Sequence, residues 1–135
     1  MAKKPLWALS AFELVRKAKF ENLSASEITF ATLDHIKAVN PDLNAIVEDM
    51  SNEAIRRAED LDFKAKSGMP IGALFGVPVT IKINVDQKGH ATSNGVTAFK
   101  NLIAETNAPI VDHLKRAGAV FVGRTNTPEF SFRAD

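Results

Sequence analysis

The fold is decided by the stretch Val77-Pro78-Val79-Thr80-Ile81-Lys82-Ile83-Asn84-Val85-Asp86. Aliphatic residues occupy every odd position, and polar residues or proline occupy every even position. This period of two predicts a strand with one aliphatic face, which places Lys82 on the opposite face. If solvent covers that face, Lys82 is an ordinary surface cation. If protein covers it, burial disfavours the charged form and makes the amine a candidate base.

Three helices and one short strand are predicted before this stretch. The first two helices each begin with a serine followed three residues later by a glutamate, a pattern in which both side chains cap backbone N–H groups. Asn40-Pro41 should stop the second helix, and a short strand should follow from Leu43 to Glu48. The helices are predicted to run from Ser10 to Phe20, from Ser24 to Asn40 and from Asn52 to Lys66.

A strand, a helix and a second strand are predicted after residue 76. Asn107 should cap the helix, which has Pro109 in its first turn, and Gly118 should end it. Residues 119–122 are fully apolar, as in an interior parallel strand. The sequence therefore predicts an α/β fold with N-terminal helices followed by part of a mixed sheet flanked by helices. We expect residues 1–135 to form a single partial domain, mainly helical over 1–68 and α/β over 69–135.

The amino-acid composition argues against several classes of function. The 135 residues include 17 basic and 16 acidic side chains, a net charge of +1, which gives no long-range attraction to nucleic acid or to anionic membranes. No apolar run approaches the roughly 20 residues of a membrane span. The chain has no cysteine, and its three histidines show no zinc-binding spacing, so we expect no metal and no cofactor. A cytoplasmic location is the simplest interpretation.

Several stretches between Gly72 and Phe130, taken in their order and spacing, resemble the amidase-signature family of serine amidohydrolases. The resemblance is close over about residues 70–131 and loose over the helical start. The stretches are Gly72-Ala73-Leu74-Phe75-Gly76-Val77-Pro78-Val79-Thr80-Ile81-Lys82, Thr92-Ser93-Asn94-Gly95, Asn107-Ala108-Pro109-Ile110-Val111 and Ala117-Gly118-Ala119-Val120-Phe121-Val122-Gly123-Arg124-Thr125-Asn126-Thr127-Pro128-Glu129-Phe130.

The resemblance implies an α/β/α sandwich with a catalytic triad of a serine nucleophile, a second serine in a cis peptide and a lysine. Lys82 matches that lysine, the general base and acid for hydrolysis of a small-molecule amide to an acid and ammonia or an amine. The two serines belong to a later stretch resembling Gly-Gly-Ser-Ser-Gly-Gly, which this chain does not contain. We therefore expect the N-terminal part of an amidase, inactive by itself.

The resemblance also implies a border to the substrate pocket, for which the candidates are Thr125, Asn126, Thr92 and Ser93. A turn-capping role for Asn126 before Pro128 is the alternative interpretation. The sequence departs from the family pattern at Ile83, where an acid often follows the lysine, at Arg124, where a lysine is usual, and at Asn94-Gly95, where Gly-Ser is usual.

Three other interpretations stay open. The chain can belong to the amidotransferase branch, in which released ammonia passes to an acyl-tRNA through partner subunits. It can be a truncated, non-catalytic module that acts only by assembling with a partner, or a small nucleotide-binding α/β domain. An incomplete sheet leaves an exposed edge, so we also expect a homo-oligomer or another form of edge pairing.

Overall fold

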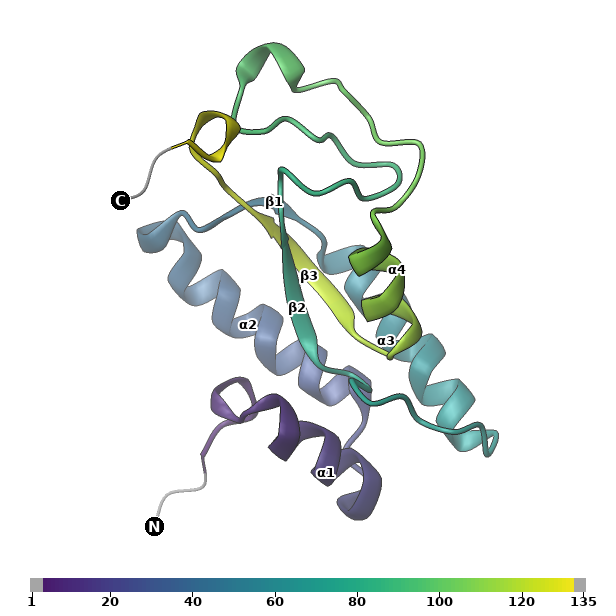
Figure 1. The fold of residues 1–135 in the computed structure, drawn as a ribbon. Helices are drawn as coiled ribbons and strands as arrows, with labels where there is room; N and C mark the ends of the chain where they lie inside the picture. The colour runs from purple at the N-terminus through teal and green to yellow at the C-terminus, as the bar shows by residue number, and fades with distance from the viewer. Residues whose placement is uncertain (1–3, 133–135) are drawn as a thin grey trace.

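The computed structural model describes residues 4–132 and contains a sheet of three strands, shown in Figure 1. The strands are β1 (Ile46–Asp49), β2 (Pro78–Lys82) and β3 (Val120–Thr125), in the spatial order β1-β3-β2. Strand β3 lies in the middle, antiparallel to β1 and parallel to β2. The chain therefore forms the predicted mixed sheet, with β2 at one edge.

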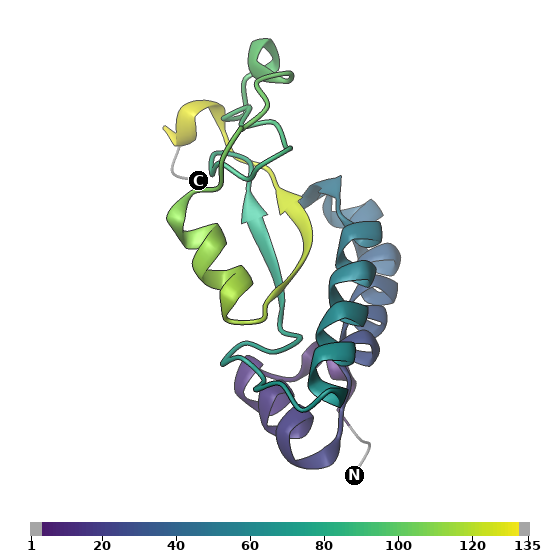
Figure 2. The same cartoon turned by 90° about the vertical axis from the view of Figure 1, so that its right-hand side faces the viewer.

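Helices cover both faces of this sheet. The N-terminal helices are α1 (Ala11–Glu21), α2 (Ala25–Leu43) and α3 (Ser51–Lys66), and α4 (Pro109–Arg116) connects β2 to β3. Figure 2 shows the sheet edge-on, with α4 on one side and α2 and α3 on the other. The α/β fold class with a helical front is confirmed.

Two apolar clusters hold the layers together. The first joins α2 and α3 to β3 and buries Ala25, Ala54, Ala58, Leu61, Phe75, Val120 and Val122. The second joins α4 to the other face and buries Met50, Ile81, Val111 and Phe121. Val79 and Ile81 of β2 both pack in the second cluster, as the alternating pattern predicts, so the even positions of β2 face away from α4.

Both predicted capping boxes are present. Ser10 and Glu13 begin α1, and Ser24 and Glu27 begin α2, each with the serine accepting a backbone N–H and the glutamate accepting another. These hydrogen bonds from serine lower the pKa of both glutamates below the ordinary value of 4.5. The start of α2 is also held by Asp62 of α3, whose carboxylate accepts the Ala25 N–H at 2.7 Å and the Ser26 N–H at 3.0 Å.

The prediction that Asn40-Pro41 stops the second helix is wrong. Helix α2 continues to Leu43, with Pro41 in its last turn, and ends at Asn44 in the left-handed conformation (φ 49°). The Asn40 side chain accepts the N–H groups of Ala45 at 3.0 Å and Ile46 at 2.9 Å, so the chain beyond the helix end is held although proline lacks a donor. The following strand consequently begins at Ile46, later than predicted.

Other boundaries also differ from the prediction, and β3 continues to Thr125 instead of ending at Val122. Helix α4 is capped by Ala108, without a side-chain hydrogen bond, because the Asn107 side chain instead binds Asp112 at 2.7 Å and the Lys88 N–H at 2.8 Å. Strand β2 ends at Lys82 instead of continuing to Asp86, because the chain turns there and the Val85 N–H binds the Lys82 carbonyl at 3.0 Å. Among the helices of residues 4–132, none combines the length and apolar character needed to cross a membrane.

Candidate functional site

The candidate site lies where β2 and β3 end. Lys82 and Thr125 are partners in the parallel register, and the Ile83 N–H donates to the Thr125 carbonyl at 3.0 Å. Asn126 follows directly. Open α/β sheets bind ligands beyond the carboxyl ends of their parallel strands, so the structure brings three of the predicted site residues together at a suitable edge.

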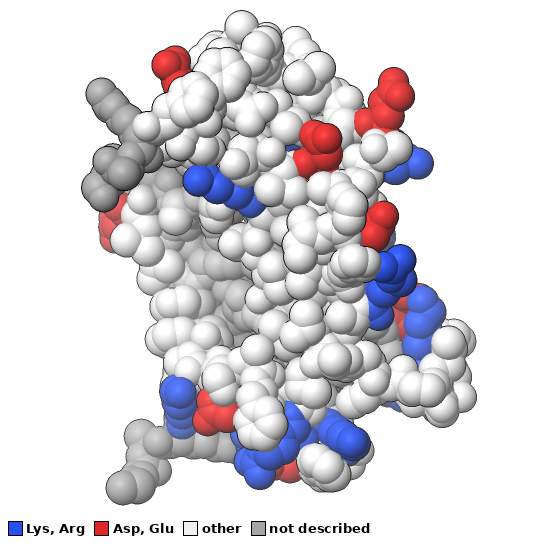
Figure 3. All heavy atoms as spheres, in the orientation of Figure 1, with Lys and Arg blue, Asp and Glu red and all other residues white. Residues whose placement is uncertain are grey.

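The Lys82 side chain is exposed on the face of β2 that turns away from α4. Its ammonium makes no hydrogen bond or ion pair with any residue between 4 and 132. Figure 3 shows that the surface is hollowed beside β2, over α2, and that the visible floor of the hollow is uncharged. In this chain the Lys82 side chain therefore extends into solvent beside an uncovered surface.

Thr92 and Ser93 lie on the loop that follows β2. Thr92 is buried, its hydroxyl donates to Asp86 Oδ1 at 2.6 Å, and its N–H donates to the Leu102 carbonyl at 2.9 Å. Ser93 is half-buried, and its carbonyl accepts the Val96 N–H at 2.8 Å. The Thr92 hydroxyl is thus already used to hold the loop in place.

A second loop, after β3, packs against the first. Ser131 Oγ lies 3.0 Å from Asn84 Nδ2, which donates to it, and 2.8 Å from Thr127 Oγ1. The Phe130 N–H donates to the Asn94 carbonyl at 2.9 Å. These polar contacts fix both loops beside the end of β2, and Asn84 Oδ1 remains buried without a hydrogen-bond partner.

Asn126 sits at the start of this second loop and is exposed. Its side-chain oxygen accepts the N–H of the next residue, Thr127, at 2.9 Å, a local contact within the turn. Thr125, at the end of β3, is half-buried. Both residues lie where a ligand at the sheet edge could reach them, and Asn126 also has the local structural role.

Arg124 is the residue that sequence reasoning missed. Its side chain is fully buried and donates to the carbonyls of Ala91 at 2.6 Å and Val85 at 2.9 Å, and to Glu48 Oε2 at 3.1 Å. It therefore ties β3 to β1 and to the loop that carries Thr92. The sequence offers one further signal for the burial of Arg124, besides its departure from the family pattern: it is a cation that directly follows an apolar strand segment.

Glu48 extends this buried cluster to a histidine. His90 Nδ1 lies 2.5 Å from Glu48 Oε1, and its Nε2 lies 3.5 Å from Glu53 Oε2, while only 11% of the His90 side chain is exposed. The histidine lies in a turn after β2, and it also connects that turn to β1 and α3. Over residues 4–132 no three histidine, aspartate or glutamate side chains form a metal-binding group.

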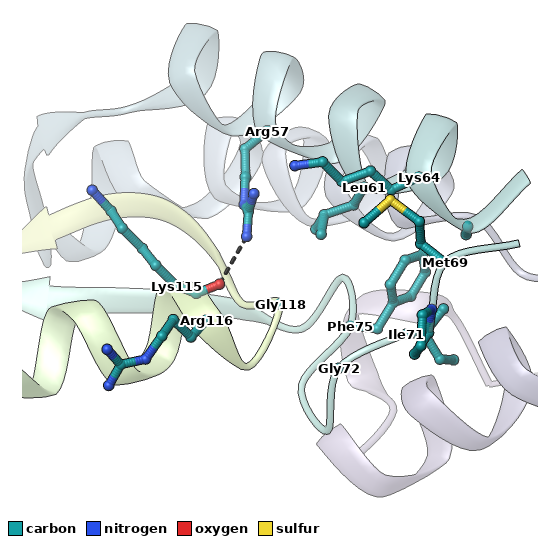
Figure 4. Close-up of a pocket in the computed structure, with 12 residues that line it drawn as sticks. Arg57, Leu61, Lys64, Met69, Ile71, Gly72, Phe75, Lys115, Arg116 and Gly118 are labelled. Carbon is teal, nitrogen blue, oxygen red and sulfur yellow. Dashed lines mark hydrogen bonds between the residues drawn. The ribbon is translucent and has the colours of Figure 1, made fainter. Parts of the chain in front are cut away.

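A hollow of about 340 Å³ lies at the other end of the sheet, between the ends of α3 and α4 (Figure 4). Figure 4 shows Arg57 reaching from α3 to the Lys115 carbonyl of α4, a hydrogen bond of 2.8 Å, with Met69, Ile71 and Phe75 at the far side. None of the residues predicted from the sequence to act on a substrate lines this hollow. It is a separate feature from the Lys82 edge.

The comparisons with known proteins assign the family. A model of the amidase family matches residues 27–135, so the chain belongs to the amidase family. In sequence, it is 48% identical over 131 residues to an indoleacetamide hydrolase of Bradyrhizobium diazoefficiens, a match that covers 97% of this chain and 25% of that protein. It is 40% identical over 126 residues to one of the subunits of the glutamyl-tRNA(Gln) amidotransferase of Carboxydothermus hydrogenoformans, covering 93% and 26%.

A solved structure agrees with the sequence matches. A bacterial aryl acylamidase of the amidase signature family superposes with a TM-score of 0.89 at 28% identity, covering 96% of this chain and 27% of that one. The recognition of the family from residues 70–131 is confirmed. The chain spans about a quarter of the length of the relatives it matches.

Proposed function

We propose that the protein to which this chain belongs hydrolyses a carboxylic acid amide, with Lys82 as its general base and acid. The observation that carries the proposal is the position of Lys82 at the carboxyl end of β2, beside Thr125, in a chain of the amidase family. The open surface beside this lysine leaves room for further polypeptide to approach it.

The chemistry requires a proton acceptor near a serine hydroxyl. In the triad that the resemblance implies, a neutral Lys82 amine takes the proton of the nucleophilic serine through the bridging serine, and the serine oxygen bonds to the amide carbon. The C–N bond then breaks, and the same proton passes to the leaving nitrogen. Water next attacks the acyl-serine ester, releasing the acid and restoring the serine.

We also propose that the 135-residue chain is inactive by itself. Its Lys82 is exposed and has no neighbouring hydroxyl within hydrogen-bonding distance in the described part of the chain. Ser131, the serine on the adjoining loop, already binds Asn84 and Thr127. Without a serine hydroxyl beside it, Lys82 has no nucleophile to activate.

The similarity to indoleacetamide hydrolase makes an arylacetamide the first substrate to test. The similarity to the amidotransferase favours a second candidate, release of ammonia from glutamine for transfer to an acyl-tRNA. Hydrolysis of indole-3-acetamide without partner proteins would favour the first, and glutaminase activity only with partner subunits would favour the second.

The test compares the full gene product with the 135-residue chain, using ammonia release from indole-3-acetamide, phenylacetamide and glutamine. Lys82→Met keeps the length of the side chain but removes the amine, so we expect a loss in kcat of about 10³-fold or more. Lys100→Met, an exposed lysine on the loop after η2 (Thr97–Phe99), is the matched control and should keep full activity. Activity retained in Lys82→Met would refute the catalytic role of Lys82, and activity in the 135-residue chain would refute its inactivity.

A further inference from the structure

A second hollow, of about 290 Å³, lies between α3 and α4 over β3, away from Lys82. Its walls are formed by Met50, the N-cap residue of α3, by Glu53 and Arg57 of α3 and by Lys115 of α4. Phe121 and Gln87 also line it. Strand β1 pairs with β3 only from Gly123 to Thr125, so no strand covers β3 at Phe121 on this side. We call this hollow the α3–α4 groove.

The groove contains a buried amide that lacks a partner. The Gln87 side chain is only 1% exposed, and its Nε2 donates to the Met50 sulfur at 3.7 Å. Its Oε1 is buried without a hydrogen bond. Burying an amide oxygen unpaired is unfavourable, so this oxygen calls for an N–H or O–H donor that the described chain does not supply.

Two cationic donors lining the same groove also lack a match. Arg57 uses its terminal nitrogens on the Lys115 carbonyl at 2.8 Å and Asp60 at 3.2 Å, but its Nε is buried without an acceptor. The Lys115 ammonium lies 5.9 Å from the centre of the Phe121 ring and forms no ion pair with a described carboxylate. One acceptor and two cationic donors are therefore unmatched in a single small space.

The described carboxylates around the groove leave Lys115 without an ion-pair partner. Glu53 lies at its wall but is half-exposed and reaches His90 at 3.5 Å, and Asp60 is paired with Arg57 and with Lys64 at 2.7 Å. Figure 3 shows basic side chains gathered on the side of the molecule where α3 and α4 end. An anion that enters the groove therefore finds the Lys115 ammonium, which has no ion-pair partner among the described residues, and the Arg57 Nε–H, which has no acceptor.

We propose that the α3–α4 groove binds a small carboxylate whose body carries an N–H donor and an apolar or aromatic group. The carboxylate would bind Lys115 and Arg57 Nε, the N–H would donate to Gln87 Oε1, and the apolar group would pack on Met50 and Phe121. The volume is at the lower end of the range of ligand pockets, which favours a small molecule over a protein segment. This site is independent of amide hydrolysis at Lys82.

The proposal is tested by calorimetry and by NMR titration of the 135-residue chain with N-acetyl-L-phenylalaninate. Two related probes each lack one feature: N-acetyl-L-phenylalaninamide lacks the anion, and 3-phenylpropionate lacks the N–H. We expect each to bind about fivefold more weakly, with shifted NMR signals at Gln87, Lys115 and Phe121.

Matched variants assign each preference to one side chain. In Gln87→Met the preference for the probe with an N–H should disappear, while in Lys115→Met the preference for the carboxylate should disappear. Lys100→Met removes an equal charge outside the groove and should keep both preferences. Gln87→Met should also keep or raise Tm, because it replaces an unpaired buried oxygen with an apolar group of similar length.

Other results would overturn the proposal. One is the absence of binding at about 10 mM probe. Another is a preference for the probe with an N–H that is as large in Gln87→Met as in the parent chain. A third is an equal loss of probe affinity in Lys115→Met and Lys100→Met. A fall in Tm in Gln87→Met as large as that of a core truncation would show that Gln87 Oε1 is already satisfied within the folded protein. That result would also overturn it.

Discussion

Arg124 and Lys82 are two cations at the same end of the sheet, on adjoining strands, and their surroundings are opposite. Arg124 pairs in register with Ile81 and shares its covered face, whereas Lys82 pairs with Thr125 on the open face. Arg124 is fully buried and binds three oxygen atoms, whereas Lys82 is exposed and has no partner in residues 4–132. A change of one residue along a strand reverses the face, and with it the environment of the charge.

This contrast separates a structural cation from a proposed catalytic one. Arg124 connects three segments of the chain and positions the loop that follows β2. The Lys82 side chain makes no hydrogen bond or ion pair with residues 4–132, which leaves its amine available for the catalytic role that we propose. The two residues should therefore respond in opposite ways to replacement.

The largest expected effect is the loss of stability in Arg124→Met. The substitution leaves the carbonyls of Ala91 and Val85 without their donor inside the protein and removes one of the two partners of Glu48, so the free energy of unfolding should fall by about 3 kcal/mol. Lys82→Met, the matched control, should change it by less than about 0.5 kcal/mol. Urea unfolding followed by circular dichroism measures both free energies. Similar losses of stability in the two variants would contradict the distinction between a structural Arg124 and a Lys82 without a structural role.

An intermediate loss of stability is expected for Gly95→Ala, at the contact between the two loops beside Lys82. Gly95 has φ 72°, and a Cβ added there would lie 2.4 Å from the Thr127 carbonyl oxygen. Gly95→Ala should therefore cost about 2–3 kcal/mol, from backbone strain and from separation of the loops. Thermal unfolding at fixed pH provides the measurement.

Gly89 supplies the control for this substitution. It has a similar backbone conformation, φ 86°, but a Cβ there meets no atom within 4 Å. Gly89→Ala should thus show the strain alone, about 1 kcal/mol. Equal losses of stability in Gly89→Ala and Gly95→Ala would mean that the loops beside Lys82 are not held by close packing. The surroundings of Lys82 would then be less rigidly fixed than those of Arg124.

The smallest effect concerns exposed charges that, unlike Lys82, are hydrogen-bonded. Hydrogen bonds from Ser10 and Ser24 lower the pKa of Glu13 and Glu27 in the folded chain. A lowered pKa stabilises the fold above the unfolded value of 4.5, and this stabilisation is lost as the pH falls through the folded-state pKa.

The Tm should accordingly fall as the solution is acidified below about pH 4.5. In a Glu13→Gln, Glu27→Gln double variant this fall should be shallower, while Lys82→Met should follow the parent curve. Identical acid profiles for the double variant and the parent chain would show that these caps contribute nothing to the pH dependence.

The sequence predicted local structure well where one segment decides the result. The serine–glutamate pairs at Ser10 and Ser24 begin both helices, and the aliphatic residues of β2 pack beneath α4 as alternation requires. Pro41 shows the limit, because a side chain beside it, Asn40, repairs the helix end through contacts with the following strand. These hydrogen bonds depend on the path of the chain after the helix, which the local sequence does not determine.

The candidate site shows the same limit. The sequence pattern and the family resemblance together selected Lys82, Thr125 and Asn126, which the parallel register places at one edge. The role of Arg124 could not be predicted because its acceptors, on Glu48, Val85 and Ala91, lie on segments far apart in the sequence. Likewise, the use of the Thr92 hydroxyl by Asp86 depends on how the intervening turn folds.

The strand order has a consequence for how the chain reaches this structure. Within residues 4–132, β1 precedes the other two strands in the sequence but pairs only with β3, the third of them, so about 70 further residues must be made before it gains a neighbour. Helices α1 and α2 carry their own start signals and can form locally much earlier. Such dependence on distant pairing slows folding, so strand amides should gain protection from hydrogen exchange later than the amides of the early helices.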